Sequence, residues 1–342
     1  MTVFDTTASD AARYFAKPSY QRALFQFGHT IVLFGVVVYL MYLSLSVHYG
    51  LTLALSLLAT AAYLRLFMIG HDCSHRSYLP RRWQNALLGN LIGVLTNTPL
   101  KYWQYQHMIH HRTMGNLDQR GTGDVTTLTI EDYENASLAQ RVWYRIYRNP
   151  FLLMFVFAPV HFVFLQRLPL EHSRPAKEIW LSVMGTNIGI GIYYTTMIYW
   201  MGLVPFLLVY LPIVMFSSIG AVWLFYIQHQ FEDTYWKRDQ VWTYRDATLN
   251  GSSFYDLPRW GHWISGNIGY HHIHHLNPRI PNYRLAACHA ANPELQRARH
   301  ISFGESFGLA NLALWDEQAE RLISFKEYEQ RRDKMAGEPE PE

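Results

Sequence analysis

The stretch Gly269-Tyr270-His271-His272-Ile273-His274-His275-Leu276-Asn277-Pro278 decides how the rest of the chain must be arranged. If it is helical, His271, His274 and His275 stand at i, i+3 and i+4, so three imidazoles share one face. Gln106-His107-Met108-Ile109-His110-His111 repeats this spacing, and His71-Asp72-Cys73-Ser74-His75 adds a pair at i, i+4. Eight imidazoles are more than one ion takes, so the pattern predicts two metals close together.

The three histidine segments lie far apart in the sequence, so the fold has to bring them together. Imidazole is a good ligand for iron, copper, zinc and nickel, and the spacing by itself does not name the metal. With 17 histidines in 342 residues, two HxxHH patterns and one HxxxH are a strong signal, and scattered surface histidines are the weaker explanation.

Composition indicates a membrane protein with a sizeable polar part. Half of the residues are hydrophobic, yet the mean hydropathy is −0.06, which suggests apolar spans joined to polar segments. The net charge of +3 is weak and no long basic run is present, so a nucleic-acid partner is not expected. Cys73 and Cys288 are the only cysteines, which argues against a disulfide framework and favours a reducing compartment.

Four apolar runs are close to the roughly 20 residues that cross a bilayer. They are Thr30–Val47, Leu51–Gly70, Ile179–Trp200 and Leu203–Ile227, and short loops join them into two hairpins. A fifth run, Phe151–Leu165, is shorter and contains Pro159 and His161, so we expect an interfacial or re-entrant segment there. Trp83–Leu100 is moderately apolar and fits an interfacial helix, and Ser137 is a plausible cap for a helix to Arg148.

A parity argument gives the topology. If Phe151–Leu165 does not cross, two spans separate the second histidine segment from the third, and all three emerge on one face. Apart from Arg65, the lysines and arginines fall on that side, which makes it cytosolic by the positive-inside rule. The sequence therefore predicts an all-α integral membrane protein with four transmembrane helices and a cytosolic helical cap that holds a histidine-rich two-metal site.

We expect residues 1–342 to form a single domain. Its predicted parts are a cytosolic or interfacial arm (1–28), a first transmembrane hairpin (29–70), two histidine segments with interfacial helices (71–177), a second hairpin (178–230), a cytosolic cap with the third histidine segment (231–336) and a disordered tail (337–342).

His229 stands where the fourth span returns to the cytosol, beside the other histidine segments, which favours a ligand over a merely interfacial residue. The remaining histidines are interpreted as structural or surface residues, namely His29, His48, His161, His172, His262, His289 and His300.

The segments HDCSH, HMIHH and HHIHH, in this order and with two spans before the last, resemble the three histidine boxes of the membrane-bound fatty acid desaturases. The flanking sequences Gly70-His71-Asp72, Gly115-Asn116-Leu117-Asp118, Gly123-Asp124-Val125 and His275-Leu276-Asn277-Pro278-Arg279-Ile280-Pro281-Asn282-Tyr283 are similar to the bacterial and plastid-like Δ12 (omega-6) branch. The similarity runs from about residue 65 to 335.

The resemblance implies an oxygen-dependent acyl desaturase with two iron ions and O2 as co-substrate. The implied metal ligands are His71, His75, His107, His110, His111, His271, His274 and His275, with His229 as the additional one. Carboxylates of Asp72, Asp118, Asp124 and Glu232 are candidates for orienting the imidazoles. In some relatives an asparagine one turn before the additional histidine holds a metal-bound water, whereas this chain has Phe225.

The implied partners are an acyl lipid or acyl thioester substrate and a separate electron donor of ferredoxin or cytochrome b5 type, because no heme-binding cytochrome b5 segment is present. The implied location is a multi-pass protein of the bacterial inner membrane with its active site on the cytoplasmic face.

Two other interpretations remain open at this point. A related di-iron hydroxylase or ketolase acting on a carotenoid or alkane shares the histidine boxes, and its product carries a new oxygen instead of a new double bond. A metal transporter or transmembrane heme carrier would place its histidines in mid-membrane, whereas here they gather beyond the ends of the spans.

Overall fold

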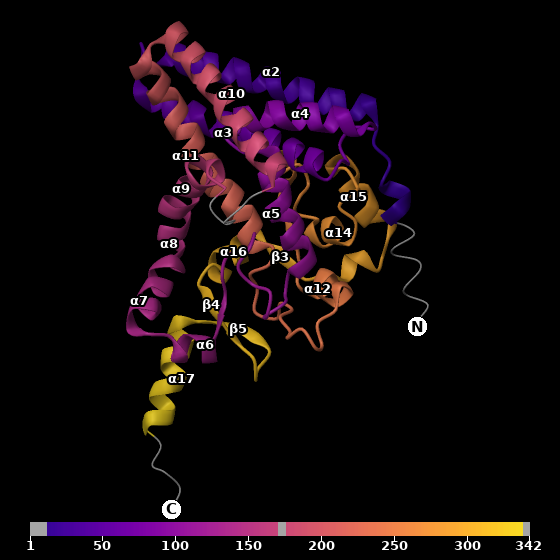
Figure 1. Ribbon diagram of the computed structural model, residues 1–342, viewed down its shortest axis with the longest axis vertical. Coiled ribbons are helices and arrows are strands. Elements are labelled where there is room, and N and C mark those ends of the chain that lie inside the picture. Colours follow the sequence, from indigo (N-terminus) through magenta and orange to yellow (C-terminus); the bar gives the residue numbers. More distant parts are fainter. Residues whose placement is uncertain (1–11, 170–175, 338–342) are drawn as a thin grey trace, which may run out of the picture.

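Two long helical hairpins form the upper part of the molecule in Figure 1. The structure, a computed structural model, describes residues 12–169 and 176–337. The first hairpin consists of α2 (Tyr20–Ser44) and α3 (Tyr49–Ser74), and the second of α10 (Lys177–Met201) and α11 (Leu203–Ile227). The tail predicted for 337–342 lies outside the described residues from position 338 onward, as does His172.

The turn between α2 and α3 is held by side chains that satisfy the helix ends. His48 Nδ1 accepts a hydrogen bond from Gly50 N at 3.0 Å and thereby caps α3. Across the turn, the buried hydroxyls of Ser44 and Thr52 lie 2.7 Å apart. His48 therefore has a structural role, as the sequence predicted.

The tips of the two hairpins lie side by side (Figure 1). Gly202 joins α10 to α11 with φ +86°, a conformation in which a residue with a side chain would be strained. Near this tip the Trp200 ring packs on Tyr39 and Tyr42 of α2, with centroids 6.4 and 5.5 Å apart. The four helices therefore end together at one side of the molecule.

Within the residues that the structure describes, length and apolar composition identify four helical segments that could cross a membrane, namely α2, α3, Pro150–Arg167 and α11. The expected number of four is confirmed, but the membership differs from the prediction, which counted α10 and not Pro150–Arg167. Polar residues such as Thr186, Asn187 and Thr195 lower the hydropathy of α10. The arrangement of the helices bears on whether α10 or Pro150–Arg167 is the fourth span.

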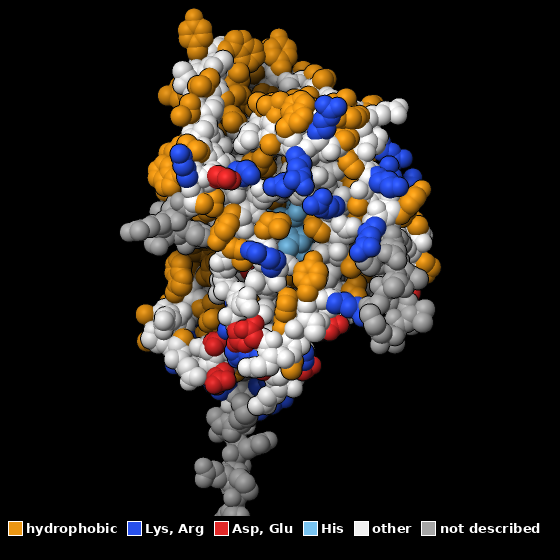
Figure 2. Space-filling model, turned by 45° about the vertical axis from the view of Figure 1, so that its right-hand side comes forward, with side chains coloured by type: hydrophobic (Ala, Val, Ile, Leu, Met, Phe, Trp, Pro, Cys, Tyr) orange, Lys and Arg blue, Asp and Glu red, His pale blue; other side chains and the backbone are white. Residues whose placement is uncertain are grey.

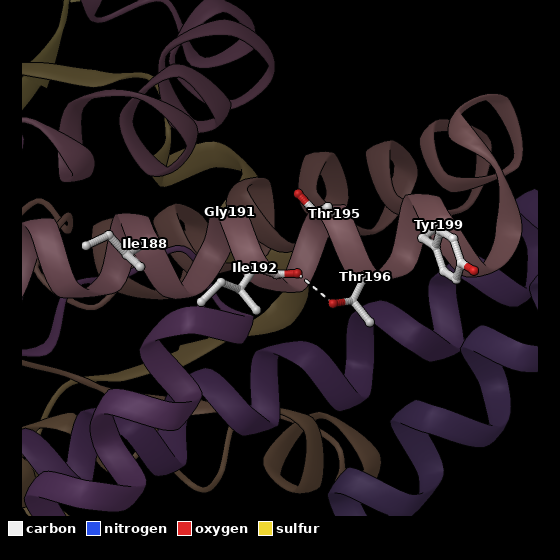
Figure 3. A pocket seen from close by; sticks show the side chains of 6 residues that line it. All are labelled: Ile188, Gly191, Ile192, Thr195, Thr196 and Tyr199. Atoms are coloured by element: carbon white, nitrogen blue, oxygen red, sulfur yellow. Dashed lines mark hydrogen bonds between the residues drawn. The ribbon is translucent and has the colours of Figure 1, made fainter.

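The outward face of α10 is apolar in spite of these polar residues (Figure 3). Ile188, Ile192 and Tyr199 are 66, 64 and 93% exposed, and they line a shallow groove with Gly191, Thr195 and Thr196. The Thr196 hydroxyl donates to the Ile192 carbonyl at 2.8 Å, so this polar group needs no water. Such a face suits contact with lipid.

Pro150–Arg167 contains one continuous helical run, made of α8 (Pro150–Leu152), a π-helical turn (Leu153–Phe157) and α9 (Ala158–Val163), and a 3₁₀ turn (Leu165–Arg167) follows it. In Figure 1, α9 lies beside α11, and α8 continues from it toward α7. Side chains of Pro150–Arg167 pack against α11 and around a cavity described below. The π-helical turn distinguishes this segment from α2, α3, α10 and α11, and its interfacial or re-entrant placement stays a prediction.

Two helices of equal length connect the first hairpin to the cap. α4 (Arg82–Leu95) exposes Trp83, Leu87 and Leu91, as expected for an interfacial helix, and it ends before the predicted Leu100. The turn that precedes it is closed by buried Asn85, whose side chain accepts from Leu79 N and donates to Leu79 O. α5 (Leu100–Thr113) then descends beside α3 and α10.

The cap is built from short elements. Its helices are α6 (Ile130–Asn135), α7 (Leu138–Tyr147), α12 (Tyr244–Asn250), α13 (Arg259–Ile264), α14 (His271–Leu276), α15 (Asn282–Ala291), a 3₁₀ turn (Leu295–Arg297), α16 (Phe303–Leu309) and α17 (Phe325–Gly337). Ser137 caps α7 and Arg148 follows its end, as predicted.

Five short strands accompany these helices. β1 (Leu128–Thr129) pairs in parallel with β4 (Leu312–Asp316), with Leu128 opposite Leu314, and β4 pairs antiparallel with β5 (Arg321–Ser324). β2 (Phe254–Asp256) pairs in parallel with β3 (His300–Ser302). None exceeds five residues, so the predicted class, a helical membrane protein with a helical cap, is confirmed.

Buried Arg148 ties this cap to the hairpins. One guanidinium nitrogen donates to Leu312 O at 2.7 Å, and the group lies over the Tyr226 ring, 5.3 Å from its centroid. Because Tyr226 is in the last turn of α11, Arg148 holds the end of this helix against the cap.

Candidate metal centre

The nine predicted histidine ligands meet where four helices end or pass. His71 is in the last turn of α3 and His75 follows it, while His107, His110 and His111 are on α5. His229 lies two residues beyond α11, and His271, His274 and His275 are on α14. Eight of the nine are buried, and His229 is half-buried.

Two groups of imidazole nitrogens result. The first contains His71, His75, His107 and His274, and the second contains His110, His229, His271 and His275; within each group one nitrogen per ring lies within 4.8 Å of every other. His111 lies between them. Its Nε2 is 3.0 Å from Nε2 of His107 and of His274, while its ring stacks on His275 with centroids 4.2 Å apart.

The two HxxHH helices contribute to the groups in opposite ways. On α5 the i, i+4 pair His107 and His111 faces the first group, and His110 faces the second. On α14 the i, i+4 pair His271 and His275 faces the second group, and His274 faces the first. Each helix therefore donates to both groups, and this places the groups next to each other.

The spacing of the nitrogens fits metal ions. Nε2 atoms of neighbouring rings are 2.9 to 3.3 Å apart, for example His71 to His107 at 3.1 Å and His229 to His271 at 2.9 Å. Two imidazoles bound to one ion at ~2.05 Å would have their nitrogens ~2.9 Å apart at a right angle and ~3.3 Å apart at a tetrahedral angle. A hydrogen bond between two facing Nε2 atoms uses the lone pair of only one of them. A cation at the centre of each group would accept the lone pairs of all its Nε2 atoms.

The rings are held in the neutral form that binds metal. Burial, and after it the neighbouring imidazoles, lowers the pKa of six of these side chains well below the ordinary histidine value; they are His75, His107, His111, His271, His274 and His275. Burial and then His110 lower the pKa of His229 to about 3. The buried Nε2 of His75 has no hydrogen-bond partner, as expected of a ligand atom.

Two of the four predicted carboxylates contact an imidazole. Asp72 Oδ1 lies 3.2 Å from His71 Nδ1, and its Oδ2 accepts from Asn282 N at 2.6 Å and from the Asn282 side chain at 2.8 Å. Asp124 Oδ1 accepts from His110 Nδ1 in a close contact. Each carboxylate fixes the ring so that Nε2 points to the group.

Asp118 and Glu232 do not reach the imidazoles, so for these two residues the sequence prediction is wrong. Asp118 forms an ion pair with Arg238 at 2.9 Å and accepts from Asp239 N. Glu232 is exposed and contributes its backbone carbonyl to Leu322 N. Both belong to polar loops of the cap, where an arginine or solvent is the nearer partner.

Two further contacts could not be read from spacing. Gly251 O accepts from His229 Nδ1 at 2.7 Å, which turns His229 Nε2 toward His271. Asn282, in the flanking sequence after the third histidine segment, holds Asp72 as described above. Phe225 lies against the second group, with its centroid 4.9 Å from His110 and 5.9 Å from His229, so no polar side chain supplies a ligand from this position.

His272 belongs to another cluster. Its ring is buried on the opposite side of α14 and faces Phe254 and His289, with centroids 6.4 and 5.8 Å apart. His262 and His300 also pack on Phe254. In the described part of the chain, these histidines form no group of nitrogens close enough for a metal.

An apolar cavity of about 460 Å³ opens onto both histidine groups. His71 and His107 of the first group and His271 of the second form part of its wall. The rest is largely apolar and comes from α3, α5, α7, the Pro150–Arg167 segment and α11, including Leu64, Phe67, Trp103, Phe157, Phe162 and Phe225. His161 is also in the wall, with its Nε2 2.9 Å from Gln166 Nε2, and it belongs to neither group.

Comparison with known proteins gives a consistent result. The sequence model of a family described as "Fatty acid desaturase" matches residues 46–307. A "Fatty acid desaturase" of Bacillus subtilis is 41% identical over 91% of this chain and 88% of its own length. An "sn-1 oleoyl-lipid 12-desaturase" of Synechocystis is 26% identical over 67% of this chain and 64% of its own, and an "sn-1 acyl-lipid omega-3 desaturase (ferredoxin)" of Nostoc is 27% identical over 88% and 83%.

Proposed function

We propose that this chain, which belongs to the fatty acid desaturase family, introduces a cis double bond of the Δ12/omega-6 type into a membrane-borne acyl chain. Membership of the family makes it a desaturating enzyme of the membrane. The reaction converts –CH2–CH2– to –CH=CH–. It takes two hydrogens from the chain, two electrons from an external donor and two protons, and it reduces one O2 to two waters.

The observation that carries this proposal is the apolar cavity that ends at both histidine groups. An acyl chain has no polar group along its methylenes, so it binds by removal of apolar surface from water. Phe67, Phe162 and Phe225 supply such a surface, and His71, His107 and His271 stand in the same wall. A methylene pair in this cavity would lie against the metal centre and away from solvent.

Two iron ions are the proposed cofactor. His71, His75, His107, His111 and His274 would hold one, and His110, His229, His271 and His275 the other. Bound iron supplies the activation of O2 that abstraction of hydrogen from an unactivated methylene needs. Burial lowers the pKa of His75, His107, His111, His229, His271, His274 and His275, which favours their neutral form. Asp72, Asp124 and the Gly251 carbonyl orient three of the nine rings.

The Δ12 assignment rests on the flanking sequences and on the names of relatives at 26% identity, such as the Synechocystis enzyme. The substrate is an acyl lipid or an acyl thioester. We further propose that the histidine groups face the cytoplasm of a bacterial inner membrane, with α2, α3, α10 and α11 as the spans. In support, the two hairpin tips lie together and carry no lysine or arginine.

Product analysis tests the reaction. The chain is expressed in a host that makes only saturated and monounsaturated fatty acids, and new double bonds are located by mass spectrometry of derivatised lipids. We expect a diunsaturated acyl chain in cells with the wild type and none with His271→Ala. A new hydroxyl or keto group in place of a double bond would favour the hydroxylase or ketolase, and no change in any lipid would contradict the proposal.

Cysteine labelling tests the orientation. Cys73 and Cys288 are both buried, so single exposed cysteines can be introduced without strong background. Ser46→Cys and Leu203→Cys lie at the hairpin tips, and Glu131→Cys lies in α6 of the cap. The first two should react with a membrane-impermeant maleimide added outside the cell and the third should not. Outside labelling of Glu131→Cys would contradict the topology.

A further inference from the structure

Lysine and arginine side chains gather on one face of the molecule (Figure 2). In this view they surround a hollow in which histidine side chains are visible, and most of the acidic side chains in sight lie lower down. The face is of interest because the proposed reaction needs electrons that this chain does not itself supply.

α5 contributes a stripe to the surface near the first histidine group, in which Lys101 and Gln104 are half-buried and Met108 and Arg112 are exposed. Lys101, Gln104, Met108 and Arg112 fall within about 80° of one another around the helix, at 100° per residue. Met108 is 41% exposed and Arg112 is exposed, whereas His107, His110 and His111 are buried. His110 lies on the side of α5 opposite this stripe, and His111 flanks it, about 60° from Met108. Gln104 donates to Ser74 O in a close contact, so the stripe adjoins the end of α3.

Two arginines from loops extend this stripe. Arg76 directly follows His75 at the end of α3 and is exposed, and its neighbour Ser77 donates to Asp72 O at 3.0 Å. Arg279 is exposed in the loop after α14, three residues before Asn282, which donates to the Asp72 carboxylate. Both loops are thus fixed around Asp72. We call Arg76, Lys101, Arg112 and Arg279, with Met108 among them, the cationic face.

The four cations have no acidic partner among the residues that the structure describes. Within residues 12–169 and 176–337, none of them has an ion-pair partner, whereas Arg238 in the cap pairs with both Asp118 and Glu317. An exposed arginine follows the end of each histidine segment, directly after His75 and His111 and four residues after His275. The excess of positive charge is therefore concentrated beside the proposed metal centre.

Residues of the cationic face are direct sequence neighbours of the histidines. Met108 is bonded to His107, Arg112 to His111 and Arg76 to His75, so a protein seated here would be separated from the first group by single residues. An exposed apolar residue within a rim of charges is the usual composition of a transient protein interface.

We propose that the cationic face is the docking surface for a small, soluble, acidic electron-carrier protein of the iron–sulfur class. The inference rests on the proposed function, since each turnover of that reaction consumes two electrons from outside the chain. Two carrier molecules each deliver one electron and are oxidised. The acyl chain gives up two hydrogen atoms, that is two electrons and two protons. With two further protons from solvent, these four electrons reduce one O2 to two waters. Charge complementarity selects the partner, because a carrier with a negative surface is steered to this face and a positive one is repelled.

The test compares wild type with Arg76→Glu/Arg112→Glu/Arg279→Glu, each purified into nanodiscs of uncharged lipid. The reductant is a reduced acidic [2Fe–2S] ferredoxin, and turnover is followed by product formation at several ferredoxin concentrations. We expect the KM for ferredoxin to rise about tenfold or more in the triple variant, because electrostatic steering changes association rates by about 10 to 1,000. The kcat at saturating ferredoxin should change less than twofold.

Ionic strength gives a second readout. For wild type the KM should rise as salt increases from about 0.01 to 0.15 M, since the Debye length falls from about 30 to 8 Å. For the triple variant this dependence should be lost. Arg332→Glu on α17, also an exposed arginine, is the matched control and should behave as wild type. A triple replacement by Gln, which removes the charges without reversing them, should give an intermediate KM and guards against misfolding of the Glu variant.

Chemically reduced enzyme separates the two proposals. In a single turnover with dithionite-reduced protein and oxygen, wild type and the triple variant should form equal amounts of product. If wild type forms none, the proposed function fails. If both form product but the ferredoxin KM and its salt dependence are unchanged in the variant, the docking surface is refuted, and this includes the case in which these arginines contact lipid head groups instead.

Discussion

Removal of His229 is the sharpest test of the proposed centre, because no histidine box contains this residue. In the structure its Nε2 lies 2.9 Å from His271 Nε2, and Gly251 O holds its other nitrogen at 2.7 Å. His229→Ala deletes one of the four imidazoles of the second group and leaves His110, His271 and His275. The first group, with His111, keeps all five of its rings.

The expected effect follows from this asymmetry. Loss even of a residue that only orients a metal ligand costs about 10- to 100-fold in affinity or activity, and loss of a ligand should cost at least the upper value, or ~2.7 kcal/mol of binding free energy. Phe225 lies beside the open position and offers no replacement donor. We therefore expect the variant to retain close to one iron per chain where wild type has two, and to form no detectable product.

The assay is a chelator titration followed by metal analysis of the purified protein. In wild type both ions should leave over a similar range of chelator, whereas in His229→Ala one should leave at a concentration about 100-fold lower or more. His161→Ala is the matched control. It also replaces a single histidine beside an apolar segment, but its ring contacts Gln166 in the cavity wall and its iron content should stay at two. Two tightly held irons and normal turnover in His229→Ala would refute the assignment of the second group.

Three other predictions concern neighbouring residues. His272→Ala should keep its iron and some desaturase activity while His271→Ala loses essentially all, because His272 faces Phe254 and His289 on the other side of α14; the opposite order of activities would mean that the helix register is wrong. Asp124→Asn should weaken iron binding about 10- to 100-fold, whereas Asp118→Asn, whose carboxylate pairs with Arg238, should leave it unchanged, and equal effects in a chelator titration would contradict the geometry. The metal-free protein should lose stability as pH falls from about 6.5 toward 3. In this window the unfolded chain binds protons that the buried imidazoles do not, since the pKa of His229 is lowered to about 3, and each such group contributes at most ~1.4 kcal/mol per pH unit. Thermal unfolding at pH 4 to 7 measures this, and a constant midpoint would argue against burial of neutral rings.

The sequence predicted the parts of the structure that depend on local periodicity. A helix turns by 100° per residue, so HxxHH and HxxxH place their imidazoles on one face whatever the tertiary structure is. Long apolar runs likewise give helices of membrane-spanning length, and Ser137 gives a helix start, because these effects act within a few residues. The spacing explains why the histidines of one helix share a face; that chain parity places the three segments on one side of a membrane stays a prediction.

Effects that depend on separate segments were decided by the tertiary structure alone. Asp118 and Asp124 are two aspartates six residues apart on one polar loop, and the sequence does not distinguish them. Only Asp124 contacts a histidine, because Arg238 from a distant segment forms an ion pair with Asp118. Composition favours Pro150–Arg167 over α10 as a span, but the contacts of Trp200 with Tyr39 and Tyr42 place α10 beside the first hairpin.

The division of the imidazoles between two groups is the clearest case. The same HxxHH spacing sends its i, i+4 pair to the first group on α5 and to the second group on α14. Spacing fixes which rings share a helix face, but the rotation of one helix against another fixes which rings from different helices meet. That rotation results from packing of the whole interface, including the Gly251 carbonyl that turns His229 and the Asn282 amide that holds Asp72. The sequence by itself therefore predicted which histidines gather at the candidate centre, and the tertiary structure determined how they divide between the two groups.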